Sequence, residues 1–304
     1  VASNRINTPE LADRLIAGVR DKGPLCVGVD PHAAMMPALF GSAGPEAAAK
    51  WGVALVERCV GRAAVVKPQA GLFERWGARG MAALEQVCQA ATRAGLIVIL
   101  DAKRGDIGST AEGYAEGYLG ASSSCPCDAI TVNPYMGVDT IEPFVAVAER
   151  EGKGVVVLAR TSNPGSKDFQ QQLIAGPQGE PLYLHVARAL APMVARLRGP
   201  ETGWSGLMMV AGATGPAEAA RLRATSGDAL FLVPGYGAQG AGARESMAGF
   251  VQRPGGLEGG VVNASRSVAM PDGATGATAL KDWERAIDLA ISAAQAELVE
   301  ASRS

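Results

Sequence analysis

Eight short runs rich in valine, isoleucine and leucine recur along the chain, and they restrict its fold more than any other feature. The runs are almost continuously apolar, which is typical of strands buried on both faces of a parallel sheet. Amphipathic stretches between them predict helices. The expected strands span residues 25–29, 63–66, 96–100, 129–132, 154–159, 207–211, 229–233 and 260–262, and the expected helices include 81–93, 141–150, 182–198 and 216–225.

Eight alternating strand–helix units form a closed barrel more naturally than an open sheet. We therefore expect an α/β fold, a single (β/α)8 TIM barrel over residues 1–304, although the length alone also allows two domains. An opening helix at about 9–19, with Thr8 as N-cap and Pro9 at its first position, would cover the barrel floor. A last helix would span about 282–299.

Charge and composition exclude several classes of partner. Lys plus Arg is 28 and Asp plus Glu is 30, so the net charge is -2 and no basic block is available for nucleic acid. No apolar run approaches the roughly 18 residues that span a bilayer, and no signal-peptide pattern opens the chain. The five cysteines are an odd number without a disulfide or zinc pattern, which favours a cytoplasmic protein.

Polar residues end six of the eight predicted strands. In a parallel barrel these strand ends meet at one rim, which is the usual catalytic face. Any single one of these side chains can simply solvate a strand end, but the whole set favours a site. The six are Asp30, Lys67, Asp101, Asn133, Arg160 and Asn263.

The densest group of charges follows the third predicted strand, in the run from Asp101 to Ile107. Side chains alternate along a strand, so Asp101 and Lys103 should share a face, with Asp106 beyond the turn. Carboxylates nearby favour the ammonium form of a lysine. Lys103 is therefore expected to donate a proton rather than to act as a free-amine nucleophile, unless the group is only a surface ion pair.

A second group of residues predicts a phosphate site. A glycine-rich loop at 234–240 follows the seventh strand, and Arg266 follows the eighth. Barrels of this type often bind phosphate there, because glycines let backbone N–H groups approach an anion and arginine offers a bidentate donor. The long stretches 161–179 and 234–259 are candidate lids, with Tyr236 in the second.

No metal site is predicted. The two histidines are far apart in sequence: His32 is expected near the rim and His185 in a helix with a structural role. Cys125 and Cys127 are too closely spaced for an ordinary zinc site and lack a second pair.

These residues together resemble the orotidine 5'-phosphate decarboxylase family, in its longer-chain branch. The family motif D-x-K-x-x-D-I followed by G-S-T is unbroken from Asp101 to Thr110, and an S-x-P-G segment begins at Ser162. The resemblance extends from Asp30 to Arg266 and implies decarboxylation of orotidine 5'-monophosphate to uridine 5'-monophosphate, in pyrimidine biosynthesis, without a cofactor.

The resemblance also implies a role for each matching residue. Lys103 would stabilise and protonate the carbanion at C6 of the pyrimidine ring, with Asp101, Lys67 and Asp106 as its charged neighbours. It further implies a homodimer, in which Asp106, Ile107 and Thr110 reach the partner's site. The substrate-binding residues would be Asp30, Ile107, Thr110, Ser162, Pro234, Gln239 and Arg266.

Two alternatives stay open. A Mg²⁺-dependent sugar-phosphate enzyme resembling 3-hexulose-6-phosphate synthase shares the D-x-K-x-x-D core. A catalytically silent barrel that only binds a nucleotide would also retain the charged rim.

Overall fold

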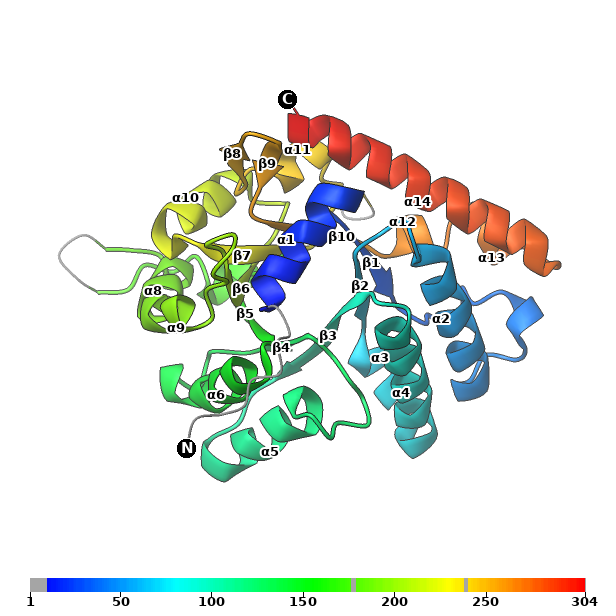
Figure 1. The fold of residues 1–304 in the computed structure, drawn as a ribbon, viewed down its shortest axis with the longest axis horizontal. Coiled ribbons are helices and arrows are strands. Elements are labelled where there is room, and N and C mark those ends of the chain that lie inside the picture. Colours follow the sequence, from blue (N-terminus) through cyan, green and yellow to red (C-terminus); the bar gives the residue numbers. More distant parts are fainter. Residues whose placement is uncertain (1–9, 176–178, 238–239, 304) are drawn as a thin grey trace.

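The computed structural model describes residues 10–175, 179–237 and 240–303. Parallel strands close into a barrel surrounded by helices (Figure 1), so the expected α/β barrel is confirmed. The order around the barrel is β1-β10-β7-β6-β5-β4-β3-β2. The strands are β1 (Leu25–Val29), β2 (Val65–Pro68), β3 (Ile97–Arg104), β4 (Ala129–Val132), β5 (Gly154–Arg160), β6 (Ser205–Ala211), β7 (Ala229–Val233) and β10 (Gly260–Ala264).

The strands form because their apolar side chains have a buried surface on both sides. Every residue of β1, β4, β6, β7 and β10 is buried, as expected for a sheet covered by helices. The first and last barrel strands pair in parallel, with Leu25 opposite Val262 and Val27 opposite Ala264. This pairing closes the barrel.

Helices surround the barrel and connect successive strands. In Figure 1 α14 runs along the outside, against α11, α12 and α13. The helices are α1 (Leu11–Lys22), α2 (Pro45–Cys59), α3 (Ala70–Glu74), α4 (Gly77–Arg93), α5 (Gly108–Leu119), α6 (Glu142–Glu151), α7 (Ser166–Phe169), α8 (Leu182–Ala189), α9 (Ala191–Arg196), α10 (Pro216–Ser226), α11 (Ala243–Ser246), α12 (Arg266–Ala269), α13 (Asp272–Thr275) and α14 (Leu280–Arg303).

The helix predicted over 182–198 is wrong in its continuity, because two helices occupy this stretch. The first, α8, ends at Ala189, and α9 begins at Ala191 with a proline in its first turn. That residue, Pro192, has no N–H to donate to the preceding turn, and its ring excludes the carbonyl four residues earlier. The break therefore follows directly from one residue.

The opening helix α1 lies across the amino-terminal end of the barrel (Figure 1). Its apolar face, which includes Leu11, Leu15 and Ile16, is buried in one cluster with Val65 and Ile99. Thr8 and Pro9, which were expected to start this helix, lie outside the described residues. With this end covered, the carboxyl ends of the strands remain open for a site.

The two long stretches named above as candidate lids contain some regular structure. The stretch 161–179 includes α7, and the stretch 234–259 includes α11 and a small antiparallel hairpin. The hairpin strands are β8 (Val251–Arg253) and β9 (Gly256–Glu258), which pair only with each other. No helix in the described ranges combines the length and apolarity that a membrane-spanning helix requires.

Candidate active site

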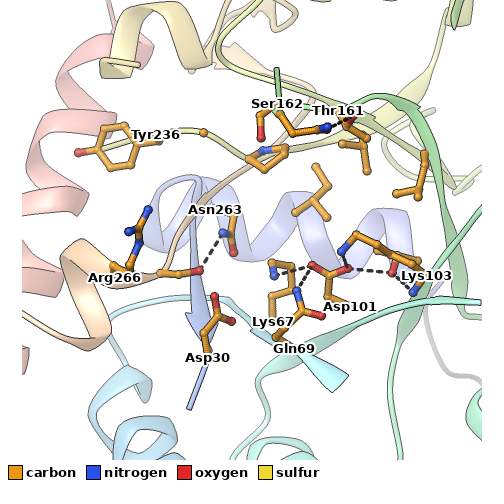
Figure 2. Close-up of a pocket in the computed structure, with 18 of the residues that line it drawn as sticks. Asp30, Lys67, Gln69, Asp101, Lys103, Thr161, Ser162, Tyr236, Asn263 and Arg266 are labelled. Carbon is orange, nitrogen blue, oxygen red and sulfur yellow. Dashed lines mark hydrogen bonds and ion pairs between the residues drawn. The ribbon is translucent and has the colours of Figure 1, made fainter. Parts of the chain in front are cut away.

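A cavity of about 400 Å³ lies at the carboxyl ends of the barrel strands, and most of the predicted site residues line it. This volume is within the range of pockets that hold small molecules. Figure 2 shows the charged residues of β2 and β3 on one side and Arg266 on the opposite side. The lining residues are Asp30, His32, Lys67, Gln69, Asp101, Lys103, Thr131, Leu158, Thr161, Ser162, Asn163, Val210, Leu232, Pro234, Gly235, Tyr236, Asn263, Ser265 and Arg266.

The carboxylate of Asp101 is the centre of a hydrogen-bonded array (Figure 2). Its Oδ1 accepts from Lys103 Nζ at 2.6 Å and from Thr131 Oγ1 at 3.0 Å. Its Oδ2 accepts from Lys67 Nζ at 2.9 Å and from Gln69 Nε2 at 3.0 Å. Each oxygen therefore accepts two hydrogen bonds, and these bonds fix the orientation of the carboxylate between the two ammonium groups.

Mutual attraction keeps the buried members of this array charged. Burial alone would lower the pKa of Lys67, but the carboxylates of Asp101 and Asp30 outweigh burial and raise that pKa above its ordinary value. Burial would likewise raise the pKa of Asp101, whereas Lys67 and Lys103 hold it well below its ordinary value. Lys67 and Asp101 are almost fully buried, while the Lys103 side chain is 48% exposed. The lysine with access to a ligand is therefore Lys103.

Two members of the array, Gln69 and Thr131, are absent from the sequence-based prediction of the site. Gln69 directly follows β2, and Thr131 lies within the apolar run of β4. Strand alternation offered one signal for Gln69, because it is two residues after Lys67 and so shares its face. For Thr131 an isolated hydroxyl in an apolar run was the only available signal.

Polar groups without partners face the middle and the far side of the cavity. The Oδ1 atoms of Asp30 and Asn263 are buried and accept no hydrogen bond. Such acceptors are costly unless a ligand or water supplies a donor. Arg266 begins α12, and its exposed guanidinium forms no ion pair with the described residues. The cavity thus offers acceptors near its centre and a cation at one side.

The loops over the cavity position Ser162, His32 and Tyr236 at its edge. His32 was expected only near the rim, and it does line the cavity. Tyr236, expected in a mobile lid, is buried, and its hydroxyl donates to Glu297 Oε2 of α14 at 2.6 Å. Tyr236 therefore anchors the start of its loop to the last helix. Gln239, the other predicted phosphate contact in this loop, lies outside the described residues.

Two strand-end residues expected at the cavity do not line it. Arg160 instead donates to Ser166 Oγ at 2.7 Å and pairs with Glu218 at 3.3 Å. The pairing of β5 with β6 shifts register between Val157 and Arg160, so simple alternation fails at this strand end. Asn133 follows the end of β4, where its Oδ1 accepts the N–H of Tyr135 at 3.0 Å in a turn.

Asp106, Ile107 and Thr110 also lie outside the cavity of their own chain. They precede or begin α5, where Asp106 Oδ1 accepts the N–H of Ile107 at 2.9 Å. The Ile107 side chain is 61% exposed. These three residues therefore do not line the site that the other predicted residues form within one chain.

The remaining histidine and cysteines are separate from the cavity. His185 lies on α8, with Nδ1 at 3.5 Å from Glu180 Oε1. Cys125 and Cys127 are buried: Cys125 Sγ lies 3.6 Å from Cys88 Sγ of α4, and Cys127 Sγ lies 3.5 Å from the carbonyl oxygen of Tyr118 in α5. Within the described ranges, no three His, Cys, Asp or Glu side chains are grouped as metal ligands.

Comparison with known proteins connects this geometry to one family. The family model described as Orotidine 5'-phosphate decarboxylase / HUMPS family matches residues 23–276. The orotidine 5'-phosphate decarboxylase of Salinispora arenicola is 39% identical over 244 residues, which cover 76% of this chain and 81% of that protein. That of Deinococcus radiodurans is 40% identical over 250 residues, covering 80% and 83%. The solved structure of Leishmania donovani OMP decarboxylase has a TM-score of 0.70 and 36% identity, covering 93% of this chain and 97% of that one.

These matches extend over most of the chain and include the whole barrel from β1 to β10. They confirm the family and the enzyme class, carboxy-lyase, that the motifs around Lys103 predicted. The chain belongs to the orotidine 5'-phosphate decarboxylase / HUMPS family.

Proposed function

We propose that this protein converts orotidine 5'-monophosphate to uridine 5'-monophosphate and CO₂. The observation that carries the proposal is the Lys67–Asp101–Lys103 array on one side of the cavity, with Arg266 on the other (Figure 2). A nucleotide places its reacting base and its phosphate at opposite ends. The charged array suits the reacting base, and the guanidinium of Arg266 suits the phosphate.

The chemistry requires a cation beside the reacting carbon. The bond between C6 and the carboxylate breaks, CO₂ leaves, and the electron pair stays on C6 in the plane of the ring, where the carbonyl groups cannot delocalise it. A fixed positive charge stabilises such an anion electrostatically. Lys103 would supply this charge and then transfer a proton from Nζ to C6. The neutral amine would regain its proton from solvent, to which the side chain is partly exposed.

The other lining residues would bind and orient the nucleotide. Asp30 Oδ1, which has no partner, would accept from a ribose hydroxyl. Ser162 would contact the pyrimidine edge, and Pro234 would line the same side of the site. Gln239 and Arg266 would hold the phosphate. Binding energy from the phosphate would thereby fix a base that is remote from it.

We infer further that two chains form the working enzyme. Four exposed apolar side chains lie on the two loops that follow β3 and β4, the first of which carries Asp106, and we call them the β3–β4 loop patch: Ile107, Tyr135, Met136 and Val138. Tyr135 is 82% exposed. The two loops lie side by side, because a Cβ atom added at Gly105 would be 3.4 Å from Met136 Cε. Contiguous exposed apolar groups favour an interface, and an interface there would bring Asp106, Ile107 and Thr110 toward a second copy.

Turnover of orotidine 5'-monophosphate by the purified protein tests the proposal. We expect uridine 5'-monophosphate and CO₂ in equal amounts, with activity that survives EDTA. Lys103→Ala should lose at least about 10³-fold in kcat while keeping its fold, because the ammonium supplies both charge stabilisation and the proton. Lys50→Ala, on the exposed side of α2, is the matched control and should be unchanged.

The open alternatives give different outcomes in the same assay. A strict metal requirement would instead support the sugar-phosphate enzyme, which relatives named as decarboxylases do not favour. Binding of uridine 5'-monophosphate without any turnover would support the silent barrel. Near-normal activity of Lys103→Ala would reject the role of that lysine. A cytoplasmic location stays a prediction from the cysteine content.

A further inference from the structure

Lys103 has an unusual backbone. Among the described residues it is the only non-glycine residue with a positive φ angle, 48°. The pairing of β3 with β4 is interrupted at the same place, because the register shifts between Leu100 and Arg104. Left-handed φ values are unfavourable for residues with a Cβ atom and persist only where surrounding contacts impose them. Something must therefore hold this bulge.

The hydroxyl of Thr131 fills the gap in the ladder. Thr131 Oγ1 accepts the N–H of Ala102 at 2.9 Å and the N–H of Lys103 at 2.8 Å. The same oxygen donates its proton to Asp101 Oδ1 at 3.0 Å. A hydroxyl has one proton and two lone pairs, so these three bonds use its full capacity. Thr131 itself is buried, at 1% exposure.

The three bonds connect the two groups that fix the Lys103 ammonium. One group is the Lys103 backbone, from which its side chain starts. The other is the Asp101 carboxylate, whose Oδ1 accepts a hydrogen bond from Lys103 Nζ at 2.6 Å. Without the hydroxyl, the N–H groups of Ala102 and Lys103 would lose this acceptor, and the contacts that hold the bulge in its conformation would be lost.

We propose that Thr131 is a positioning residue that fixes the Lys103 ammonium by holding the β3 bulge and Asp101 through one hydroxyl group. The inference rests on the proposed function, because it assigns to Lys103 the reacting charge. Thr131 acts through Lys103, so its loss should affect the chemical step and leave nucleotide binding almost unchanged. A misplacement of about 1 Å at a reacting group can cost about 10²-fold in rate.

Three variants test the proposal by a split between kcat and KM. Thr131→Val keeps the shape and removes the hydroxyl, and its kcat should fall about 10²-fold while KM and the Kd for uridine 5'-monophosphate stay within about threefold. Thr131→Ser restores the hydroxyl and should recover kcat to within about threefold of the wild type. Ser205→Ala is the matched control, because Ser205 is fully buried at the start of β6, where its hydroxyl donates to Val194 and accepts from Leu207. It should lose stability and keep its kcat.

Several outcomes would overturn the inference. These are a Thr131→Val kcat within about threefold of the wild type, a change in KM instead of kcat, or a serine variant as impaired as the valine variant. If the valine variant does not fold, Thr131→Cys replaces it, since a thiol is a weak donor and acceptor. A cysteine variant with the kcat of the serine variant would then reject the role.

A structural readout separates this inference from the proposed function. Inactive wild-type protein would overturn the proposed function alone. Crystal structures of the wild type and of Thr131→Val would still decide the positioning role. We expect the valine variant to lose the positive φ of Lys103 and its contact with Asp101, and an unmoved Lys103 would reject the inference.

Discussion

Asp101 is buried between two ammonium groups, and each of the three charges depends on the other two. Burial of Lys67 or Asp101 without an opposite charge would be very costly, whereas the pair that they form, with Nζ 2.9 Å from Oδ2, compensates both charges. This dependence is asymmetric, since Lys103 is half exposed and can be solvated while Lys67 cannot. Removal of the negative charge should therefore affect Lys67 most.

The variant Asp101→Asn tests this dependence through its stability. It keeps the shape of the side chain but leaves the Lys67 ammonium buried without its nearest counter-charge, so the free energy of unfolding at neutral pH should fall by about 3–5 kcal/mol. Chemical denaturation measures the change. Asp21→Asn, at an exposed aspartate, is the control and should match the wild type.

The same variant has a pH dependence of definite sign. In the wild type the pKa of Lys67 in the folded state is raised. The lysine is therefore charged in both the folded and the unfolded protein, and its contribution to the free energy of unfolding is constant until the pH exceeds the pKa of the unfolded state, about 10.4. In the variant burial dominates and lowers that pKa, so the unfolded chain binds more protons and stability rises with pH. The difference between the free energies of unfolding of the wild type and the variant should become smaller between about pH 7 and about pH 9.5. A constant or growing difference would contradict this account.

Within the hydrogen-bonded array around Asp101, the sequence allowed prediction of the charged members and not of the neutral ones, Gln69 and Thr131. Asp30, Lys67, Asp101 and Lys103 stand out because a charge directly after an apolar strand is unusual. Thr131 does not stand out, since threonine is common in strands. Its role depends on a bulge in the neighbouring strand, which is a tertiary feature that no local pattern reveals.

Among the elements, the barrel strands were the most predictable because burial on both faces gives a continuous apolar signal. Every predicted strand overlaps the observed one, and the ends differ by a few positions, as in β2, which was predicted over 63–66 and spans Val65–Pro68, and in β3, which continues to Arg104. The β8–β9 hairpin was missed because its strands have three residues each and alternate too briefly to give a pattern. Contacts from distant residues hold it instead.

Arg223 of α10 supplies those contacts. Its guanidinium donates to the carbonyl groups of Gly249 at 2.8 Å and Gly259 at 2.9 Å, which flank the hairpin segment. It also donates to Gly227 and Ala229, both at 2.6 Å, and stacks 3.9 Å from the ring of Phe231. One planar side chain therefore joins α10, β7 and both ends of the hairpin segment.

We expect Arg223→Lys to loosen this region. Lysine keeps the charge but lacks the planar set of five donors and the stacking, so the free energy of unfolding should fall by roughly 2–3 kcal/mol. Amide exchange should also become faster in β8 and β9. The exposed Arg221→Lys on the same helix is the control. Equal stability of the two variants would show that the hairpin has other anchors.

At the scale of the whole molecule, the barrel leaves two of its features unused within one chain. One is the β3–β4 loop patch, whose exposed apolar side chains have no cover. The other is Asp106, the second aspartate of the D-x-K-x-x-D motif, which does not line the cavity of its own chain. A two-fold dimer formed through the patch would account for both, because the same surface meets itself across the axis.

That the chain is a single domain also stays a prediction, testable as one cooperative unfolding transition.

Mixing two inactive variants tests whether sites are shared between chains. Lys103→Ala lacks the reacting ammonium, and Asp106→Asn lacks the carboxylate that a partner would donate. With equal amounts and free exchange, half of the dimers are mixed, and each mixed dimer contains one site with both native residues. About a quarter of all sites should regain wild-type activity by this two-fold symmetry.

A second mixture provides the control, because its two defects lie in the same cavity. Lys103 and Asp30 both line the pocket of a single chain, so a mixture of Lys103→Ala with Asp30→Asn contains no site in which both residues are native. Its activity should equal the average of the separate variants. If the first mixture also shows no gain although mass spectrometry detects mixed dimers, Asp106 acts within its own chain. A gain of activity in both mixtures would mean that Lys103 and Asp30 of one chain do not serve the same site, and it would reject the cavity of a single chain as the active site.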